Sequence, residues 1–439
     1  MTPGPQEPAE AVVGPRRRQL GLAAAVLLAS ILGGYLSTGK PERAFVSSGP
    51  VVAATARQGG VQPGSSLPVL PPRVQQLSAR LPLARQVAQL FLVDFPGPRV
   101  PPGLRAAVRA HGWGGIIFTR SNFATDGQAR GLATELRRLA PAGDRLPPLL
   151  AADQAGGPGT ALPNLPPRSE ARLGATRRPV LARRDARAAA IALRARGFAL
   201  TLAPYADVDV AAGALTAGTF STDPAVVTRF TTAALGGYAR AGMLAAVGHF
   251  PGEGSASQDP DLGVGSVGQS LADLRRRDEA PFAAVAARAP AILMSNALYA
   301  AFDGVTPAGL LPTAVAELRG HLRFHGVIVS DDLGAAVLAT RGSMGEAAVL
   351  ALRAGVDLIH VSGGPAGQQQ AYRAVLRAAR RGEIPAARLQ GALGRVLALK
   401  LAGRAVRVPP PRPPRAGGPS RRRRRTRGHC RAGARSCSP

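Results

Sequence analysis

The chain is poor in cysteine and in aromatic side chains, and each shortage excludes a class of protein. Its only two cysteines, Cys430 and Cys437, lie close to the end of the 439 residues. A disulfide framework or a cysteine-ligated metal site is therefore excluded for the rest of the chain. Aromatic residues make up 4% of the sequence, yet hydrophobic residues reach 46%. That content is enough to bury a sizeable core.

Acidic residues are also scarce, and the formal net charge is +29. Such an excess favours anionic polymers or surfaces as partners, but its distribution weakens the case for nucleic acid. Residues 404–439 carry twelve arginines and no acid. Because this Arg/Pro-rich composition buries too little apolar surface to offset the entropy of ordering, we expect a disordered tail. No specific nucleic-acid partner is expected.

The N-terminal segment carries the pattern of an export signal. Three arginines, Arg16 to Arg18, precede an apolar run from Leu20 to Leu36. A basic stretch followed by an apolar one is typical of a signal anchor or signal peptide, and the run is near the lower limit for a membrane span. We expect residues 1–40 to form a short cytoplasmic stub and a membrane anchor, with a cleaved signal peptide or a buried helix as alternatives. Residues 41–76, rich in Gly, Ser and Pro, are expected to be a linker.

Residues 77–403 show a repeated alternation of short apolar runs with longer stretches of helical period. The apolar runs cover residues 89–95, 114–118, 148–153, 198–204, 244–250, 291–296, 326–331 and 356–361. Eight such units predict an α/β fold, a (β/α)8 TIM-type barrel that forms a single catalytic domain with no C-terminal sandwich domain. A doubly wound open sheet is the alternative. Neither a dinucleotide fingerprint nor a P-loop is present.

Polar residues stand at the ends of the predicted strands, where the chemistry of a barrel gathers. They are Asp153, His249, Asn296, Asp331 and Asp332, with His360 near the last strand. Asp332 has an alternative role as the N-cap of the next helix. Asp331 directly ends its strand and is expected to point into the mouth of the barrel.

His249 is followed by a glycine-rich loop that contains Asp259 and Asp261. A metal site built from His249, Asp259, Asp261 and Asp331 is one interpretation, but the spacing matches no metal motif. A Ser-His-Asp hydrolase would need a nucleophile elbow, which the sequence lacks. Carboxylates paired at a barrel mouth instead favour glycoside cleavage, in which one attacks the sugar and a second group protonates the leaving oxygen.

Several motifs in this order resemble those of the single-domain β-N-acetylhexosaminidases of glycoside hydrolase family 3. "LARQVAQLFLVDFPG" is similar to the family's opening strand, "PLLAADQAGG" to D-Q-E-G-G, and "LTLAPYADV" to N-F-A-P-x-x-D-V. "FSTDP", "GHFPGEG" and "GVIVSDDL" resemble S-F-G-x-D-P, K-H-F-P-G-H-G and the nucleophile strand. The resemblance spans residues 77–403. It implies retaining hydrolysis of a cell-wall or other amino-sugar glycan, with no metal or organic cofactor.

The resemblance also assigns roles to residues. The nucleophile falls on Asp331, and the aspartate that orients the acid/base falls on Asp259. Asp153 and His249 match residues that hold sugar hydroxyls, and Asn296 is a further candidate for substrate binding. The family's catalytic histidine falls on Asp261, which is the main departure.

This departure leaves the proton donor open. Asp261 could serve, because the neighbouring Asp259 charge would raise its pKa. Glu253, which replaces the second histidine of H-F-P-G-H-G, is a second candidate, and the absence of any working acid/base is a third interpretation.

The resemblance fails at other sugar-binding positions too. The family's lysine, glutamate and two arginines fall on Gly248, Ala155, Pro158 and Gly218. N-acetylglucosamine is therefore not expected to bind in the usual way, and Arg120, Asn296 and Tyr205 are candidates to fill the space.

Three functional hypotheses follow. The first is an exported glycosidase with an altered acid/base loop. The second is a catalytically inactive barrel that binds glycan at the cell surface. The third is a membrane-anchored structural protein whose basic tail contacts anionic polymers.

Overall fold

The computed structural model describes residues 70–140, 146–157, 160–162, 165–211, 213–215 and 218–405. The expected membrane anchor lies outside the described residues, as does most of the expected linker. The expected tail, residues 404–439, also lies outside them except for Arg404 and Ala405, which end helix α15 (Ala386–Ala405). The first described helix, α2 (Pro72–Arg80), begins inside the segment 41–76 that is expected to be a linker. Val74 on this helix is fully buried, and α2 packs against the last helix, α15. The packed unit therefore begins before residue 77.

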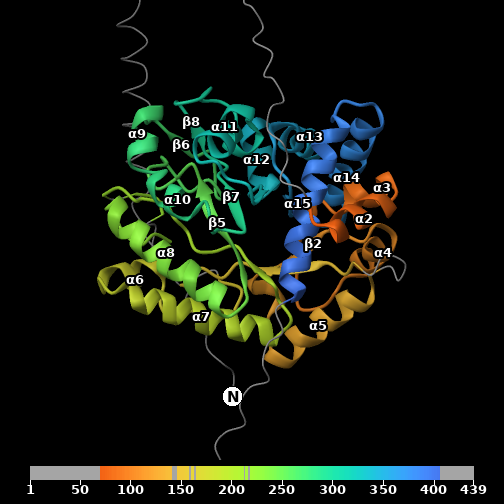
Figure 1. The fold of residues 1–439 in the computed structure, drawn as a ribbon, viewed down its shortest axis with the longest axis horizontal. Helices are drawn as coiled ribbons and strands as arrows, with labels where there is room; N and C mark the ends of the chain where they lie inside the picture. Colours follow the sequence, from red (N-terminus) through yellow and green to blue (C-terminus); the bar gives the residue numbers. More distant parts are fainter. Residues whose placement is uncertain are drawn as a thin grey trace, which may run out of the picture. The chain divides into compact units, whose positions relative to one another are not determined.

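Eight parallel strands form the sheet at the centre of the fold (Figure 1). They are β1 (Phe91–Val93), β2 (Gly115–Phe118), β3 (Leu149–Ala152), β4 (Leu200–Thr201), β5 (Leu244–Phe250), β7 (Ala291–Met294), β9 (Val327–Val329) and β10 (Ile359–Val361). Their order in the sheet is β10-β1-β2-β3-β4-β5-β7-β9. Each strand lies within one of the eight apolar runs. A parallel sheet covered on its outer face by helices is buried on both faces, which is why these runs are apolar throughout.

The two edge strands of this order meet and close the sheet into a barrel. A parallel bridge joins Val329 of β9 to Leu358, just before β10. The Leu358 N–H donates to the Ile328 carbonyl at 3.0 Å, and the Ser330 N–H donates to the Leu358 carbonyl at 2.9 Å. The barrel prediction is confirmed and the open doubly wound sheet is wrong. Only closure of this kind removes free sheet edges.

Helices surround the barrel in the order expected for repeated β-α units. The longer ones are α4 (Pro102–His111), α5 (Asp126–Arg138), α7 (Pro179–Ala195), α8 (Pro224–Arg240), α13 (Met344–Ala354), α14 (Pro365–Arg380) and α15. The shorter ones are α3 (Leu83–Ala88), α6 (Glu170–Ala175), α9 (Leu271–Arg276), α10 (Ala280–Val285), α11 (Pro312–Ala316) and α12 (Leu333–Thr340), with the turns η1 (Arg120–Asn122), η2 (Ala308–Leu310) and η3 (Glu317–His321). A small parallel pair, β6 (Ser266–Val267) and β8 (Leu298–Tyr299), forms a second sheet.

Helix α4 illustrates how local sequence sets these elements. Proline occupies its first turn, where no intrahelical N–H bond is lost. Leu104 and Val108, one turn apart, are both buried against the barrel. The helix ends at Gly112, whose φ of 60° is left-handed and favours glycine.

Within the described part of the chain, no single helix is both long and apolar enough to cross a membrane. The bent pair α12 and α13, with 106° between the two helices, passes that test by length and composition alone.

Candidate active site

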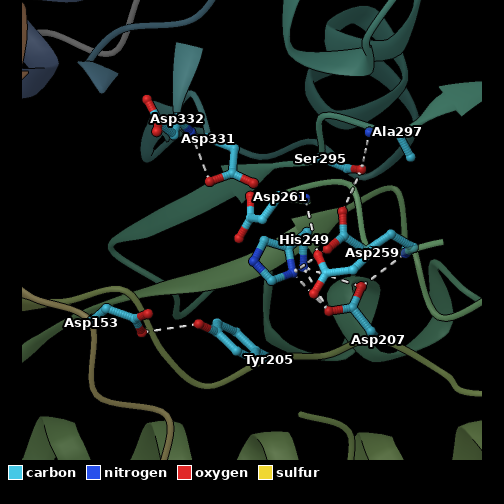
Figure 2. A network of polar contacts seen from close by, with 12 residues as sticks. Asp153, Tyr205, Asp207, His249, Asp259, Asp261, Ser295, Ala297, Asp331 and Asp332 are labelled. Carbon is cyan, nitrogen blue, oxygen red and sulfur yellow. Dashed lines mark hydrogen bonds and ion pairs between the residues drawn. The ribbon is translucent and has the colours of Figure 1, made fainter. Parts of the chain in front are cut away.

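The polar residues predicted at the strand ends converge at the C-terminal ends of the barrel strands (Figure 2). Asp153 directly follows β3, His249 is the last residue but one of β5, and Asp331 comes two residues after β9. Since all eight strands run parallel, these ends meet at one mouth. The structure thus brings together residues that are far apart in sequence.

His249 is the centre of a buried cluster. Its Nδ1 lies 2.9 Å from Oδ2 of Asp207 and 3.1 Å from Oε1 of Glu253. Burial by itself would lower the pKa of His249, but the charges of Glu253 and Asp207 outweigh it and hold that pKa well above its usual value. His249 therefore holds its proton between two carboxylates.

Glu253 is engaged inside this cluster through both of its oxygens. The hydroxyl of Ser295 donates to Oε2 at 2.6 Å, while Oε1 faces His249. Only 4% of the residue is exposed. Burial raises the pKa of Glu253 to about 8, although the His249 cation opposes this shift. Its engagement inside the barrel does not favour Glu253 as a mobile proton donor.

Asp331 and Asp261 face each other at the mouth. Asp331 is 8% exposed, and its Oδ1 accepts the Asp332 N–H at 2.8 Å. In Figure 2, Asp261 lies between Asp331 and His249. Burial and the Asp261 charge raise the pKa of Asp331 well above its usual value. The two carboxylates are close enough to titrate as a pair.

Asp261 lies on the loop after β5 and is open to solvent on one side. The surrounding protein removes part of its hydration and raises its pKa, and the Asp259 charge adds to this effect while His249 opposes it. Asp259 acts on the backbone of Asp261, because its Oδ1 accepts the Asp261 N–H at 3.0 Å. Asp259 therefore shapes the loop rather than orienting the Asp261 carboxylate.

Asp153 and Tyr205 form the opposite side of the site. The Tyr205 hydroxyl donates to Oδ1 of Asp153 at 2.9 Å, and its ring centroid lies 4.6 Å from that of His249. Burial raises the pKa of Asp153 to about 6, while the Tyr205 hydrogen bond lowers it. The Tyr205 ring also lies beside Gly218, where an added Cβ would be 3.6 Å from it. The Tyr205 ring therefore fills part of the space beside Gly218, which is one of the roles considered for it from the sequence.

Asn296 and Asp332 hold the backbone at the end of β9. The Asn296 amide donates to the Asp332 carbonyl at 2.8 Å. Asp332 caps α12 by accepting the Gly334 N–H at 2.9 Å, and it also accepts the Ser362 N–H at 3.2 Å. Burial would raise the pKa of Asp332, but the His360 charge and these hydrogen bonds lower it. The N-cap alternative for Asp332 is therefore correct.

Arg120 is exposed in η1, and among the described residues its side chain makes no hydrogen bond or ion pair with the site. It does not replace the cations that the family resemblance implies.

Three acids of the mouth were missed as site residues. Asp207 stands in the quoted "LTLAPYADV" motif but was given no role, and it is 1% exposed. Glu170 is 2% exposed and accepts the Tyr205 backbone N–H at 3.0 Å. Asp94 follows β1 directly, so the strand-end rule applied to the other strands would have found it.

The residues able to hold a metal differ from the set considered in the sequence. The ligand atoms of Asp207, His249 and Glu253 all lie within 4.8 Å of one another, and all three residues are buried. A second group of this kind, Glu279, Glu317 and His321, lies among the outer helices. Imidazole with two carboxylates is a donor set that suits zinc.

Comparisons with known proteins agree with this geometry. The model of the glycosyl hydrolase family 3 N terminal domain matches residues 83–399. A beta-hexosaminidase of Stenotrophomonas maltophilia is 32% identical over 282 residues, which cover 62% of this chain and 83% of the relative. An uncharacterized secreted glycosyl hydrolase of Arthroderma benhamiae is 31% identical over 328 residues, covering 72% of this chain and 93% of the relative.

A solved structure of a family 3 enzyme is also similar to this chain in fold and sequence. A glycoside hydrolase family 3 beta-N-acetylglucosaminidase from Paenibacillus sp. superposes with a TM-score of 0.67 at 32% identity. The match covers 74% of this chain and 63% of that one, so the present chain spans less than two thirds of that protein.

Proposed function

Because this chain belongs to glycosyl hydrolase family 3, we propose that Asp331 is the nucleophile of a retaining glycosidase and that Asp261 is its proton donor. Membership makes the chain a glycosidase of the β-hexosaminidase type with a carbohydrate substrate. The observation that carries the proposal is the facing pair of carboxylates, one buried at the end of β9 and one on the loop after β5 (Figure 2).

In the first step, the ionised Asp331 forms a bond to the anomeric carbon from below the sugar. The bond between that carbon and the leaving oxygen breaks, and the oxygen takes the proton of Asp261. In the second step, Asp261 removes a proton from water, which attacks the anomeric carbon and releases Asp331. Two inversions retain the configuration.

The coupled titration of the two carboxylates supports this division of roles. Two like charges in one site oppose each other's ionisation, so one proton is shared by the pair. When Asp261 holds it, Asp331 no longer feels the Asp261 charge. Asp331 then keeps the Asp332 N–H bond and the nearby His249 cation, both of which favour its ionised form.

Asp153 and His249 are proposed to hold sugar hydroxyls, with Asn296 fixing the backbone beside Asp332. Asp153 retains one carboxylate oxygen beyond the one that accepts the Tyr205 hydroxyl. An ionised carboxylate accepting a sugar hydroxyl makes a charge-assisted hydrogen bond.

Export is a further part of the proposal. The relative from Arthroderma benhamiae is described as secreted, and the basic and apolar pattern of residues 1–40 supports the same destination for this chain. We propose that residues 1–40 direct export and contact the membrane, that a linker joins them to the barrel, and that residues 404–439 form a tail. A cell-wall or other amino-sugar glycan is the proposed substrate.

The test is turnover of a panel of aryl β-glycosides by the wild type, Asp331→Asn and Asp261→Asn. Asp331→Asn is expected to abolish turnover of every substrate. Asp261→Asn is expected to lose ~10²–10⁴-fold on poor leaving groups and much less on good ones, because only the former need the acid. Added azide should rescue Asp261→Asn by replacing the water that needs a base. Asp332→Asn is the matched control, since asparagine caps a helix about as well as aspartate.

The inactive glycan-binding barrel is the second candidate, and one observation favours it. Among the described residues, nothing donates a hydrogen bond to the Asp261 carboxylate, and Asp259 contacts only its backbone. A folded wild type that binds glycans but turns over no member of the panel would establish this alternative and refute the enzymatic proposal.

A further inference from the structure

The mouth of the barrel concentrates negative charge without a matching cation. Asp153, Asp207, Glu253, Asp261 and Asp331 lie there, and the Asp261 charge raises the pKa values of Asp153, Glu253 and Asp331. The opposing charges that act on them come from histidines, chiefly His249 and His360. Among the described residues, no arginine or lysine forms an ion pair with any of these carboxylates.

Within the cluster, His249 is taken up by the two acids that contact it. Its single Nδ1 faces both Asp207 at 2.9 Å and Glu253 at 3.1 Å. The Nδ1–H of His249 therefore does not pair with Asp331 or Asp261. Asp331 and Asp261 add further acids on the side that faces the mouth.

The acids nearest the mouth also have unused acceptor oxygens. Asp331 is 92% buried, as its exposure of 8% shows, and among the described residues its only hydrogen bond is from the Asp332 N–H to Oδ1. The Tyr205 hydroxyl reaches only Oδ1 of Asp153. Neither of these two carboxylates has a fully buried oxygen without a partner. A ligand in the mouth can therefore reach the unused oxygens with hydrogen-bond donors and positive charge.

We propose that the sugar bound next to Asp331 is an amino sugar whose nitrogen is a free ammonium group rather than an acetamide. This inference rests on the proposed glycosidase function and names its substrate class. An ammonium has three N–H donors and one positive charge, which match the unused carboxylate oxygens. An acetamide has one N–H donor and no charge, and its carbonyl needs a donor of its own.

Donors for such a carbonyl are few in this site. One N–H of the Asn296 amide is bonded to the Asp332 carbonyl, and His249 Nδ1 is held by its two acids, which leaves the second Asn296 N–H and the His249 Nε2–H as donors. Specificity for the ammonium would therefore arise chiefly from attraction by the carboxylates.

The experiment measures binding by calorimetry, without turnover, so that it does not depend on the catalytic proposal. The probes are methyl β-D-glucosaminide, methyl β-D-glucoside and methyl N-acetyl-β-D-glucosaminide, at a pH below the pKa of the amine. The first two have nearly the same size and differ in ammonium against hydroxyl. We expect the glucosaminide to bind at least about tenfold more tightly than either of the others, corresponding to ~1.4 kcal/mol.

Variants test whether the mouth carboxylates cause this preference. Asp153→Asn is expected to reduce the ratio between glucosaminide and glucoside by about threefold or more, because it replaces a carboxylate that faces the ligand by a neutral amide. Glu383→Gln is the matched control, since its side chain is 47% exposed and pairs with Arg381 after α14, away from the strand ends of the mouth. It should leave the ratio unchanged.

Equal binding of the glucosaminide and the glucoside, or tighter binding of the acetylated sugar, would overturn the inference while leaving the glycosidase proposal intact. A Zn²⁺ titration of the same protein tests whether a metal ion, rather than an ammonium group, is the cation that these acids bind. Tight Zn²⁺ binding that disappears in Glu253→Gln, together with no preference for the glucosaminide, would assign the acids to a metal instead and would also overturn it. Preference for the glucosaminide without turnover would support this inference about the ligand and would contradict only the proposal that the protein is catalytically active.

Discussion

The substitution Tyr205→Phe tests the electrostatics of the proposed sugar site at a single hydrogen bond. The Tyr205 hydroxyl donates to Oδ1 of Asp153 at 2.9 Å and favours the ionised carboxylate. Phenylalanine keeps the ring whose centroid lies 4.6 Å from that of His249, so packing changes little. The variant removes one donor from a buried acid whose pKa burial has already raised to about 6.

The expected shift follows from the strength of that bond. A hydrogen bond to a charged group contributes ~1.5 kcal/mol at the lower end of its range, and one pKa unit corresponds to about 1.4 kcal/mol. The pKa of Asp153 should therefore rise by about one unit in Tyr205→Phe. At a pH midway between the two pKa values, the ionised fraction would fall from roughly three quarters to one quarter. Sugar binding that uses the ionised form should weaken about threefold at that pH.

The assay is an NMR titration of protein labelled with ¹³C at the aspartate carboxyl groups, with the Asp153 signal assigned through Asp153→Asn. Tyr372→Phe is a control, because its hydroxyl donates to the Ala84 carbonyl at 3.2 Å, on the outer helices. It should leave the Asp153 titration unchanged. An Asp153 pKa that stays the same or falls in Tyr205→Phe would refute this account of the site.

Two further predictions concern stability. Burial raises the pKa of Glu279 from its ordinary value of 4.5 to about 8, so the folded wild type holds a proton that the unfolded chain has lost, and its stability falls as pH rises through this window. The free energy of unfolding of Glu279→Gln, measured relative to that of the wild type, should therefore be about 2–3 kcal/mol higher at pH 8 than at pH 5. An equal difference between the two proteins at both pH values in urea unfolding would contradict this. Asp357 is fully buried and accepts hydrogen bonds from Arg319 at 2.6 Å, Arg388 at 3.2 Å and Arg395 at 2.8 Å, so Asp357→Asn should cost ~3–5 kcal/mol by leaving buried cations unpaired. Glu135→Gln, in a pair with Arg105 that is partly exposed, should cost less than about 1 kcal/mol in the same unfolding measurement, and similar losses for the two variants would refute the argument.

The architecture could be predicted because each strand of a parallel barrel is buried on both faces. Every strand of the barrel lies in an apolar run, and the glycine that ends α4 stands before the next run. The runs did not distinguish a closed barrel from an open sheet. That difference depends on whether β9 and β10 meet, and neither strand records its partner in its own sequence.

The strand-end rule pointed to residues that the structure brings to one mouth, but it did not predict their contacts. Asp331 and Asp332 are neighbours in sequence, yet one faces the mouth and the other caps α12. Asp94 follows the same rule at β1 but was passed over. Asp259 was expected to orient the Asp261 carboxylate, and its oxygen instead accepts the backbone N–H.

The sequence by itself determined the repeated β-α units and which carboxylates stand at strand ends, because burial and strand termination are local properties written in hydrophobic pattern. Only the tertiary structure decided which of those groups share a proton or a charge. Asp207 reaches His249 across 42 positions of sequence, and Glu253 reaches Ser295 across another 42. Such contacts arise when closure of the barrel brings separate strand ends to one mouth, and electrostatic coupling depends on that distance in space.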